Sequence, residues 1–105
     1  MERRAVELDT GARELGREHV AKVWLLISGI IRSVKVYRSE LGYGYTSFWF
    51  SIYSGQVTTY VDRASDGLYR LRQTYGKPPK IQTTNYADWP ELKEFYEFLE
   101  ANCAE

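Results

Sequence analysis

The stretch TSFWFSIYSGQVTTYV (residues 46–61) decides the fold, because residue character alternates on both sides of a turn signal. Alternation with a period of two is typical of β-strands, and Ser54–Gly55 suits a two-residue hairpin turn. One set of alternate positions carries the apolar residues Phe48, Phe50 and Ile52. The other set includes Trp49 and Tyr53, where a solvent-facing strand usually carries Ser, Thr or Lys. The strand is therefore packed on both sides, or it keeps one aromatic face free for a ligand.

The period of two extends over residues 33–74 and predicts a four-stranded antiparallel β-meander. Glycine-containing segments between the strands suit hairpin turns. Two prolines in GKPPK (residues 76–80) are expected to end the sheet, because proline cannot donate to a ladder. Residues 81–87 then form a linker, with room for a short edge strand. The expected strands are Ser33–Glu40, Tyr45–Tyr53, Gln56–Val61 and Leu68–Tyr75.

Before the meander, apolar residues recur at helical spacing over residues 8–31 and predict a helix that ends near Arg32. Residues 1–15 form a separate arm or short helix in the alternative interpretation. A continuous helix of this length would be longer than the sheet that it covers, at about 1.5 Å per residue. It must then bend, break at Gly16 or extend its apolar stripe onto a second copy. We therefore expect a homo-oligomer, a dimer or a tetramer.

After the linker, Asp88 and Glu91 form a capping pattern, and Pro90 suits the first turn of a helix. An apolar stripe follows on one side of this helix: Leu92, Phe95, Tyr96, Leu99 and Cys103. The expected fold class is therefore α+β in a single domain of residues 1–105. It has an N-terminal helix, a four-stranded antiparallel meander and a C-terminal helix, with both helices packed on one face of the sheet.

The three hairpin turns predict which residues face each other across the sheet. The turn at Ser54–Gly55 places Trp49 opposite Tyr60, and the turn at residues 42–44 places Tyr37 opposite Trp49. A five-residue turn at residues 63–67 places Tyr60 opposite Arg70 and, one position along, Val61 opposite Tyr69. The same register assigns one set of side chains to a core face: Val34, Val36, Phe48, Phe50, Ile52, Val57, Val61, Tyr69 and Leu71.

The opposite face is expected to carry large aromatic and basic side chains, spaced by Ser and Thr. We call these residues the aromatic face: Lys35, Tyr37, Trp49, Tyr53, Tyr60, Arg70 and Arg72. Proteins bind single-stranded nucleic acid without sequence preference through aromatic rings, which stack on the bases, and through cations, which contact the phosphates. The alternative is a homo-oligomer interface, where Tyr, Trp and Arg are also enriched.

The charge distribution agrees with a nucleic-acid partner, although the net charge of the chain is zero. Residues 32–80 carry eight basic and three acidic side chains, a net charge of +5. Residues 81–105 carry one basic and six acidic side chains, a net charge of −5, and residues 1–31 are balanced. The positive charge is therefore concentrated on the aromatic segment, and the local field matters more to a charged partner than the total.

The residues that catalysis usually needs are scarce. The only histidine, His19, is expected on a helix surface, and Cys103 has no histidine or basic residue nearby in the sequence. Asp62 and Asp66 are interpreted as turn-forming residues. No His or Cys cluster has the spacing of metal ligands, so we expect neither an enzyme nor a metal or cofactor site.

The single cysteine permits no intramolecular disulfide and indicates a reducing, cytoplasmic environment. No signal peptide is expected, because the first nineteen residues hold nine charges. The run VWLLISGII (residues 23–31) is too short to span a bilayer, so no membrane partner is expected.

The order of these segments resembles a known family. HVAKVWLLISGII, KVYRSELGYGYTSFWFSIYSGQVTTYV, GLYRLRQTYG and DWPELKEFYEFLEANC are similar in layout to the DNA-binding domain of the ThermoDBP proteins, single-stranded DNA-binding proteins of hyperthermophilic archaea. The resemblance covers nearly the whole chain and is one of layout and aromatic and basic pattern. It implies a cleft between sheet and helix lined by hydrophobic and basic side chains, sequence-tolerant binding of single-stranded DNA, no cofactor, and oligomers. From the aromatic and basic face itself we expect binding of single-stranded DNA, with RNA as a second ligand, without strong sequence preference.

Overall fold

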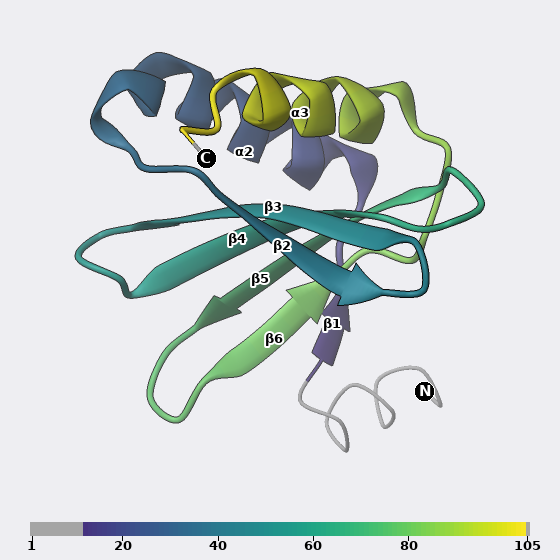
Figure 1. Cartoon of the computed structure of the whole chain (residues 1–105). Helices are drawn as coiled ribbons and strands as arrows, with labels where there is room; N and C mark the ends of the chain where they lie inside the picture. Colours follow the sequence, from purple (N-terminus) through teal and green to yellow (C-terminus); the bar gives the residue numbers. More distant parts are fainter. Residues whose placement is uncertain (1–11, 105) are drawn as a thin grey trace.

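The computed structural model describes residues 12–104 and shows an α+β fold with both helices on one side of a twisted sheet (Figure 1). With the labels of Figure 1, the helical elements are α2 (Arg17–Ile30), the short 3₁₀ helix η1 (Ile31–Ser33) and α3 (Pro90–Ala101). The strands are β1 (Ala12–Glu14), β2 (Tyr37–Gly42), β3 (Tyr45–Ile52), β4 (Val57–Arg63), β5 (Tyr69–Tyr75) and β6 (Lys80–Thr83). The predicted fold class is confirmed.

The sheet contains more strands than the four that we predicted. Its order is β1-β6-β5-β4-β3-β2. The four pairs between β2 and β6 are antiparallel, and β1 pairs with β6 in parallel. The GKPPK segment does not end the sheet but turns the chain, and Lys80 pairs with Tyr75 as the first residue of β6. Gly76 allows this reversal with a φ of +86°, and the prolines lie in the turn, outside the ladder.

The N-terminal helix is shorter than predicted, because residues 12–14 form β1 and α2 begins only at Arg17. The backbone N–H of Leu15 donates to the Thr83 carbonyl at 2.7 Å, so the preceding chain is attached to the sheet edge and not to the helix. The predicted helical segment at residues 8–11 lies outside the described residues. With 14 residues, α2 spans about 21 Å, less than the roughly 27 Å of an eight-residue strand such as β3. The length argument for a second copy is therefore wrong.

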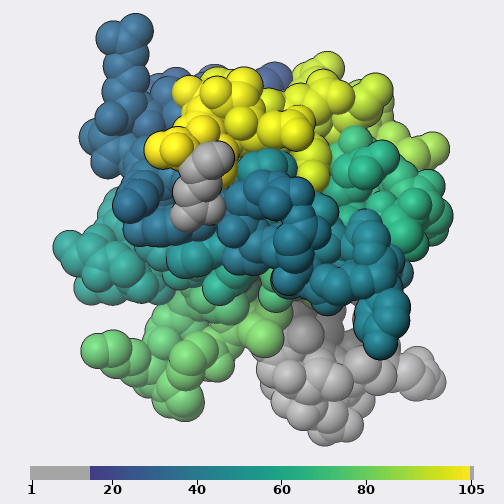
Figure 2. Space-filling model, in the orientation of Figure 1, coloured from purple at the N-terminus to yellow at the C-terminus, as the bar shows by residue number. Residues whose placement is uncertain are grey.

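The C-terminal helix begins where the sequence predicts, with Pro90 in its first turn. The predicted cap at Asp88 is wrong, because Trp89 is the N-cap residue and no side chain caps the helix. The apolar stripe of α3 is confirmed: its first four residues are buried and Cys103 is half-buried. Figure 2 shows α3 (yellow) packed closely on the strands beneath it, while the β5–β6 turn (green) projects on the other side of the sheet.

The core lies between the helices and the predicted core face of the sheet. Phe50 is fully buried against Phe95 of α3, with ring centroids 6.3 Å apart, and Phe48 packs edge-on against Tyr96 at 5.1 Å. A short series of side-chain hydrogen bonds crosses this layer. Gln73 donates to the Thr59 hydroxyl at 3.0 Å and bonds the His19 imidazole at 2.8 Å. Among the described residues, no helix has the length and hydropathy needed to cross a membrane.

The predicted strand pairs are confirmed in two hairpins, although Gly42 and not Leu41 pairs with Tyr45 beyond an irregularity at the first turn, and the register of the third hairpin is wrong. Trp49 lies opposite both Tyr37 and Tyr60, as predicted. Between β4 and β5, however, Tyr60 lies opposite Arg72 and not Arg70. The strands run on to Arg63 and Tyr69, where the chain closes a tighter turn than the one we assumed. Because the shift is two residues, every side chain keeps its predicted face.

Candidate functional site

Three aromatic rings form a row across β2, β3 and β4 on the sheet face that neither helix covers. The Tyr37 and Trp49 rings stack with centroids 4.4 Å apart and an angle of 20° between their planes. The Trp49 and Tyr60 rings follow at 5.7 Å and 36°. We call Tyr37, Trp49 and Tyr60 the aromatic row. All three side chains are half-buried, so the row presents part of its surface to solvent.

A cation closes each end of the aromatic row. The Lys35 ammonium lies 5.2 Å from the centroid of Tyr37, and the Arg72 guanidinium lies 4.3 Å from that of Tyr60. Both distances are within the range of cation–π attraction. Five of the seven residues of the predicted aromatic face therefore lie in one line, and Arg70 is joined to Arg72 through a shared bond to Asp62. Only Tyr53 stands apart: it lies at the β3–β4 turn, is 64% exposed, and makes no ring or cation contact with the described residues of the row.

The row is held in place by hydroxyl groups of neighbouring positions. The Trp49 indole Nε1 donates to Ser39 Oγ at 3.0 Å, which fixes the orientation of the ring. Beside the row, the Ser51 and Thr58 hydroxyl groups bond each other at 2.8 Å. The ring faces, however, are turned toward one another and toward the two end cations. The sequence predicted open ring faces, so this mutual stacking is a new feature.

A buried carboxylate lies on the same face, one row further along the strands. Asp62 is 0% exposed and accepts bonds from two arginines of β5. Arg70 donates through Nε at 2.9 Å, and its Nη2 lies 2.8 Å from the same oxygen, Oδ2. Arg72 donates to Oδ2 through Nε at 2.6 Å and to Oδ1 through Nη2 at 3.2 Å. We call Asp62, Arg70 and Arg72 the arginine–aspartate cluster. The interpretation of Asp62 as a turn residue is wrong, because it lies within β4.

A second aromatic pair borders this cluster. The Arg70 guanidinium lies 4.4 Å from the centroid of Tyr86, whose ring meets Tyr45 edge-on at 6.0 Å. Burial raises the pKa of Tyr86 above its ordinary value, and the Arg70 charge opposes this rise. Sequence reasoning missed Tyr86 because it lies in the predicted linker. The isolated bridge between Tyr69 and Ala87 brings this segment alongside β5.

The single histidine and the single cysteine of the sequence both make contacts within the fold. His19 bonds Gln73, and the Cys103 thiol points to the Val36 carbonyl at 3.5 Å. Within residues 12–104, no three His, Cys, Asp or Glu side chains gather in a way that could hold a metal ion.

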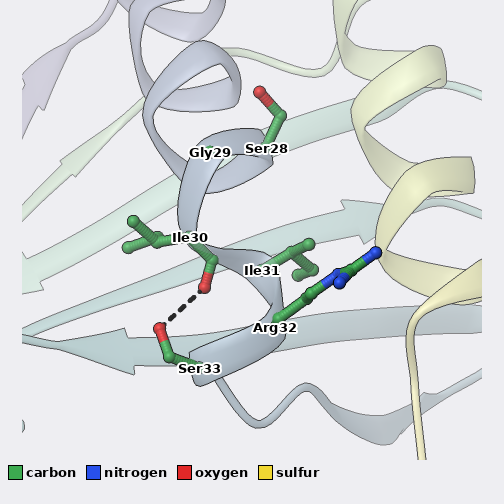
Figure 3. A pocket seen from close by; sticks show the side chains of 6 residues that line it. All are labelled: Ser28, Gly29, Ile30, Ile31, Arg32 and Ser33. Atoms are coloured by element: carbon green, nitrogen blue, oxygen red, sulfur yellow. Dashed lines mark hydrogen bonds between the residues drawn. The ribbon is translucent and has the colours of Figure 1, made fainter.

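The described surface has several hollows. One, at the end of α2, is lined by Ser28 to Ser33, with Arg32 as its one ionisable side chain (Figure 3). The dashed bond in this view is Ser33 Oγ donating to the Ile30 carbonyl at 2.9 Å. It closes the 3₁₀ turn, so the hydroxyl is used structurally.

Comparison with known proteins finds no relative to set beside this geometry. No protein-family model, no curated protein and no solved structure matches the chain.

Proposed function

We propose that this protein binds single-stranded DNA, and RNA through the same contacts, with little sequence preference. One observation carries the proposal: an unbroken line of contacts runs from Lys35 through the aromatic row to Arg72, on a sheet face that neither helix covers. A row of aromatic rings with a cation at each end suits a single strand, whose bases stack on rings and whose phosphates are attracted to cations.

The ends of the row are where a base can stack. Trp49 already has Tyr37 on one side and Tyr60 on the other, so it is the support of the row. Lys35 is exposed and carries a flexible side chain, which can leave the Tyr37 ring. A base then takes the place of the ammonium on Tyr37, and the ammonium moves to a phosphate. Stacking of this kind contributes about 1–3 kcal/mol per base and accepts any base.

The charge of the face sets the expected salt dependence. Asp62 offsets one of the three cations Lys35, Arg70 and Arg72, so the net charge of this surface is about +2, less than the sequence indicated. Each phosphate that a protein neutralises on a single strand contributes a slope of about −0.7 in log affinity against log salt. We therefore expect a slope near −1.4 for two phosphates, instead of the value near −2 that three unpaired cations would give.

The resemblance to the ThermoDBP domain supports the same ligand, through its layout of helix, aromatic and basic strands and closing helix. It also supports a homo-oligomer, which we keep as a second candidate because of one observation. The outer side of α2 exposes the apolar residues Leu25, Leu26 and Ile30, at 75%, 43% and 37%. A second copy that covers this side would leave the aromatic face open, so the two proposals are compatible. The single cysteine is consistent with a cytoplasmic protein.

The decisive experiment is a titration of fluorescein-labelled oligothymidine with the protein, followed by fluorescence anisotropy at several salt concentrations. The proposal expects saturable binding that weakens with salt at the slope given above. Duplex DNA of the same length should bind more weakly, because its paired bases cannot stack on the aromatic row. The absence of binding at low salt and tens of micromolar protein would refute the proposal. An oligomer with no response to the oligonucleotide would favour the second candidate alone.

A further inference from the structure

The arginine–aspartate cluster has a feature that goes beyond general positive charge. Both guanidinium groups bond the same carboxylate oxygen, Asp62 Oδ2, so two like charges are held side by side. They would repel each other without the carboxylate between them. The carboxylate is fully buried, and each arginine side chain remains 27% exposed. The cluster therefore fixes the two cations from below and leaves part of each at the surface.

The bonds to Asp62 use the same edge of each guanidinium, the one formed by Nε and Nη2. A guanidinium has five N–H donors in a planar fork, so the edge formed by Nη1 and the second Nη2 hydrogen remains. Within residues 12–104, no hydrogen bond or ion pair engages the Nη1 atom of Arg70 or Arg72. These remaining edges have the geometry that recognises a phosphate by two parallel hydrogen bonds.

Two rings restrict how the guanidinium groups can turn. Tyr60 lies 4.3 Å from Arg72, and Tyr86 lies 4.4 Å from Arg70, each measured from Cζ to the ring centroid. Each arginine is therefore held by a carboxylate at one edge and by a ring at its face. Such a pair loses little conformational freedom when a ligand binds, which is what makes a subsite effective.

We propose that the arginine–aspartate cluster is the phosphate-binding subsite of the aromatic face, with Asp62 as the residue that positions both arginines. This inference rests on the proposed function and adds a specific chemical contact to it: one backbone phosphate of the strand accepts hydrogen bonds from the outer edges of Arg70 and Arg72. Ser47 lies on β3 directly opposite Asp62 of β4. Its buried hydroxyl has no hydrogen-bond partner among the described residues. The cluster therefore has a polar border on this side as well.

The lysine variants Arg70→Lys and Arg72→Lys test the fork, because each keeps the positive charge and removes the paired donors. We expect each variant to bind oligothymidine at least about tenfold more weakly, with the salt slope unchanged. Arg63→Lys is the matched control, since Arg63 is an exposed arginine of β4 on the opposite face of the sheet. It should bind within about twofold of wild type. Lysine variants that bind as tightly as wild type would overturn the subsite.

Asp62→Asn separates positioning from simple charge. If Asp62 only competes with phosphate, its loss raises the local positive charge, and binding becomes tighter with a steeper salt slope. If Asp62 positions the arginines, binding becomes weaker in spite of the added positive charge, and this is the result that we expect. Circular dichroism verifies that the variant is folded. If it is not, the lysine variants still decide whether the outer edges of Arg70 and Arg72 bind phosphate.

The outcomes distinguish the subsite from the proposed function. Wild-type protein that does not bind oligothymidine refutes both. Wild-type protein that binds, together with lysine variants that bind equally well, refutes only the subsite and leaves the aromatic row as the binding surface.

Discussion

Tyr37 and Trp49 stack nearly parallel across β2 and β3, with their ring centroids 4.4 Å apart. A ring whose face is covered by another ring cannot offer that face to a base. The pair therefore acts as one unit, in which Trp49 supports Tyr37 and the outer side of Tyr37 carries the exposed Lys35. This arrangement predicts that the two rings contribute to binding in different ways.

Replacement of Tyr37 by alanine removes the ring on which a base is proposed to stack. We expect Tyr37→Ala to weaken oligothymidine binding by about 1–3 kcal/mol, which is the usual contribution of one stacked base. Tyr43→Ala is the matched control, because Tyr43 is 96% exposed at the tip of the β2–β3 turn and lies outside the row. Anisotropy titrations of both variants measure the difference. Equal losses in the two variants would contradict a specific stacking site.

Replacement of Trp49 by alanine removes the support from the middle of the row. We expect Trp49→Ala to weaken strand binding by at least as much as Tyr37→Ala, about 1–3 kcal/mol, because both neighbouring rings lose their partner. The melting temperature should change little, since Trp49 is half-buried and lies outside the helix-covered core. A variant that unfolds and cannot be titrated would instead show that the row is a second core.

Replacement of Phe50 by alanine tests the other face of the same strand. Phe50 is fully buried against Phe95, so its truncation leaves a cavity in the core. We expect a loss of about 3–5 kcal/mol in the free energy of unfolding, measured by urea denaturation. Strand binding by the fraction that remains folded should be unchanged. A harmless Phe50→Ala would mean that the two faces of β3 are assigned the wrong way round.

The local parts of this fold could be predicted from the sequence, because hairpins are determined by their own turns. Ser54 and Gly55 both have positive φ, at 57° and 85°, and Gln56 bonds back to Tyr53, so this turn and its register were readable. The β4–β5 turn was not. A shift of two residues keeps the same alternation, so the sequence pattern does not distinguish the two registers. In the structure the backbone N–H of Ala64 donates to the Leu68 carbonyl, and the strands pair as far as Arg63 and Tyr69.

The parts that depend on distant segments were only partly predicted: residues 81–87 were given room for a short edge strand, and β1 was missed. β6 and β1 have only four and three residues, too few for alternation to be visible, and they form because a neighbouring strand edge accepts them. Asp62 was assigned to a turn because the expected strand ended at Val61, and the two arginines that bond it come from the strand whose register was wrong. The correct register places Asp62 directly opposite Arg70.

The exposed apolar side of α2 gives a prediction about assembly. Leu25 is 75% exposed, and Leu25→Glu would place a charge in the centre of any contact made there. If a second copy covers this side, the variant should elute with the mass of a single chain while wild type elutes as an oligomer, measured by size-exclusion chromatography with light scattering. Ala101→Glu makes the same change of charge on the exposed end of α3 and should leave the oligomer intact. Wild-type protein with the mass of one chain would remove the second candidate function.

The ion pair between the two helix starts gives a prediction about pH. Arg17 Nη2 donates to both carboxylate oxygens of Glu91, at 2.8 and 3.0 Å, and this hydrogen bonding holds the pKa of Glu91 below its ordinary value. Because the carboxyl is more acidic in the folded chain than in the unfolded one, its contribution to stability is present above the unfolded pKa of about 4.5. It is lost as the pH falls through the lower folded pKa.

The melting temperature of wild type should therefore fall more steeply below about pH 5 than that of Glu91→Gln, which has no carboxyl to protonate. Glu94→Gln, on the exposed side of the same helix, should follow the wild-type curve. Parallel curves for wild type and Glu91→Gln would show that the bond between Arg17 and Glu91 contributes nothing to stability.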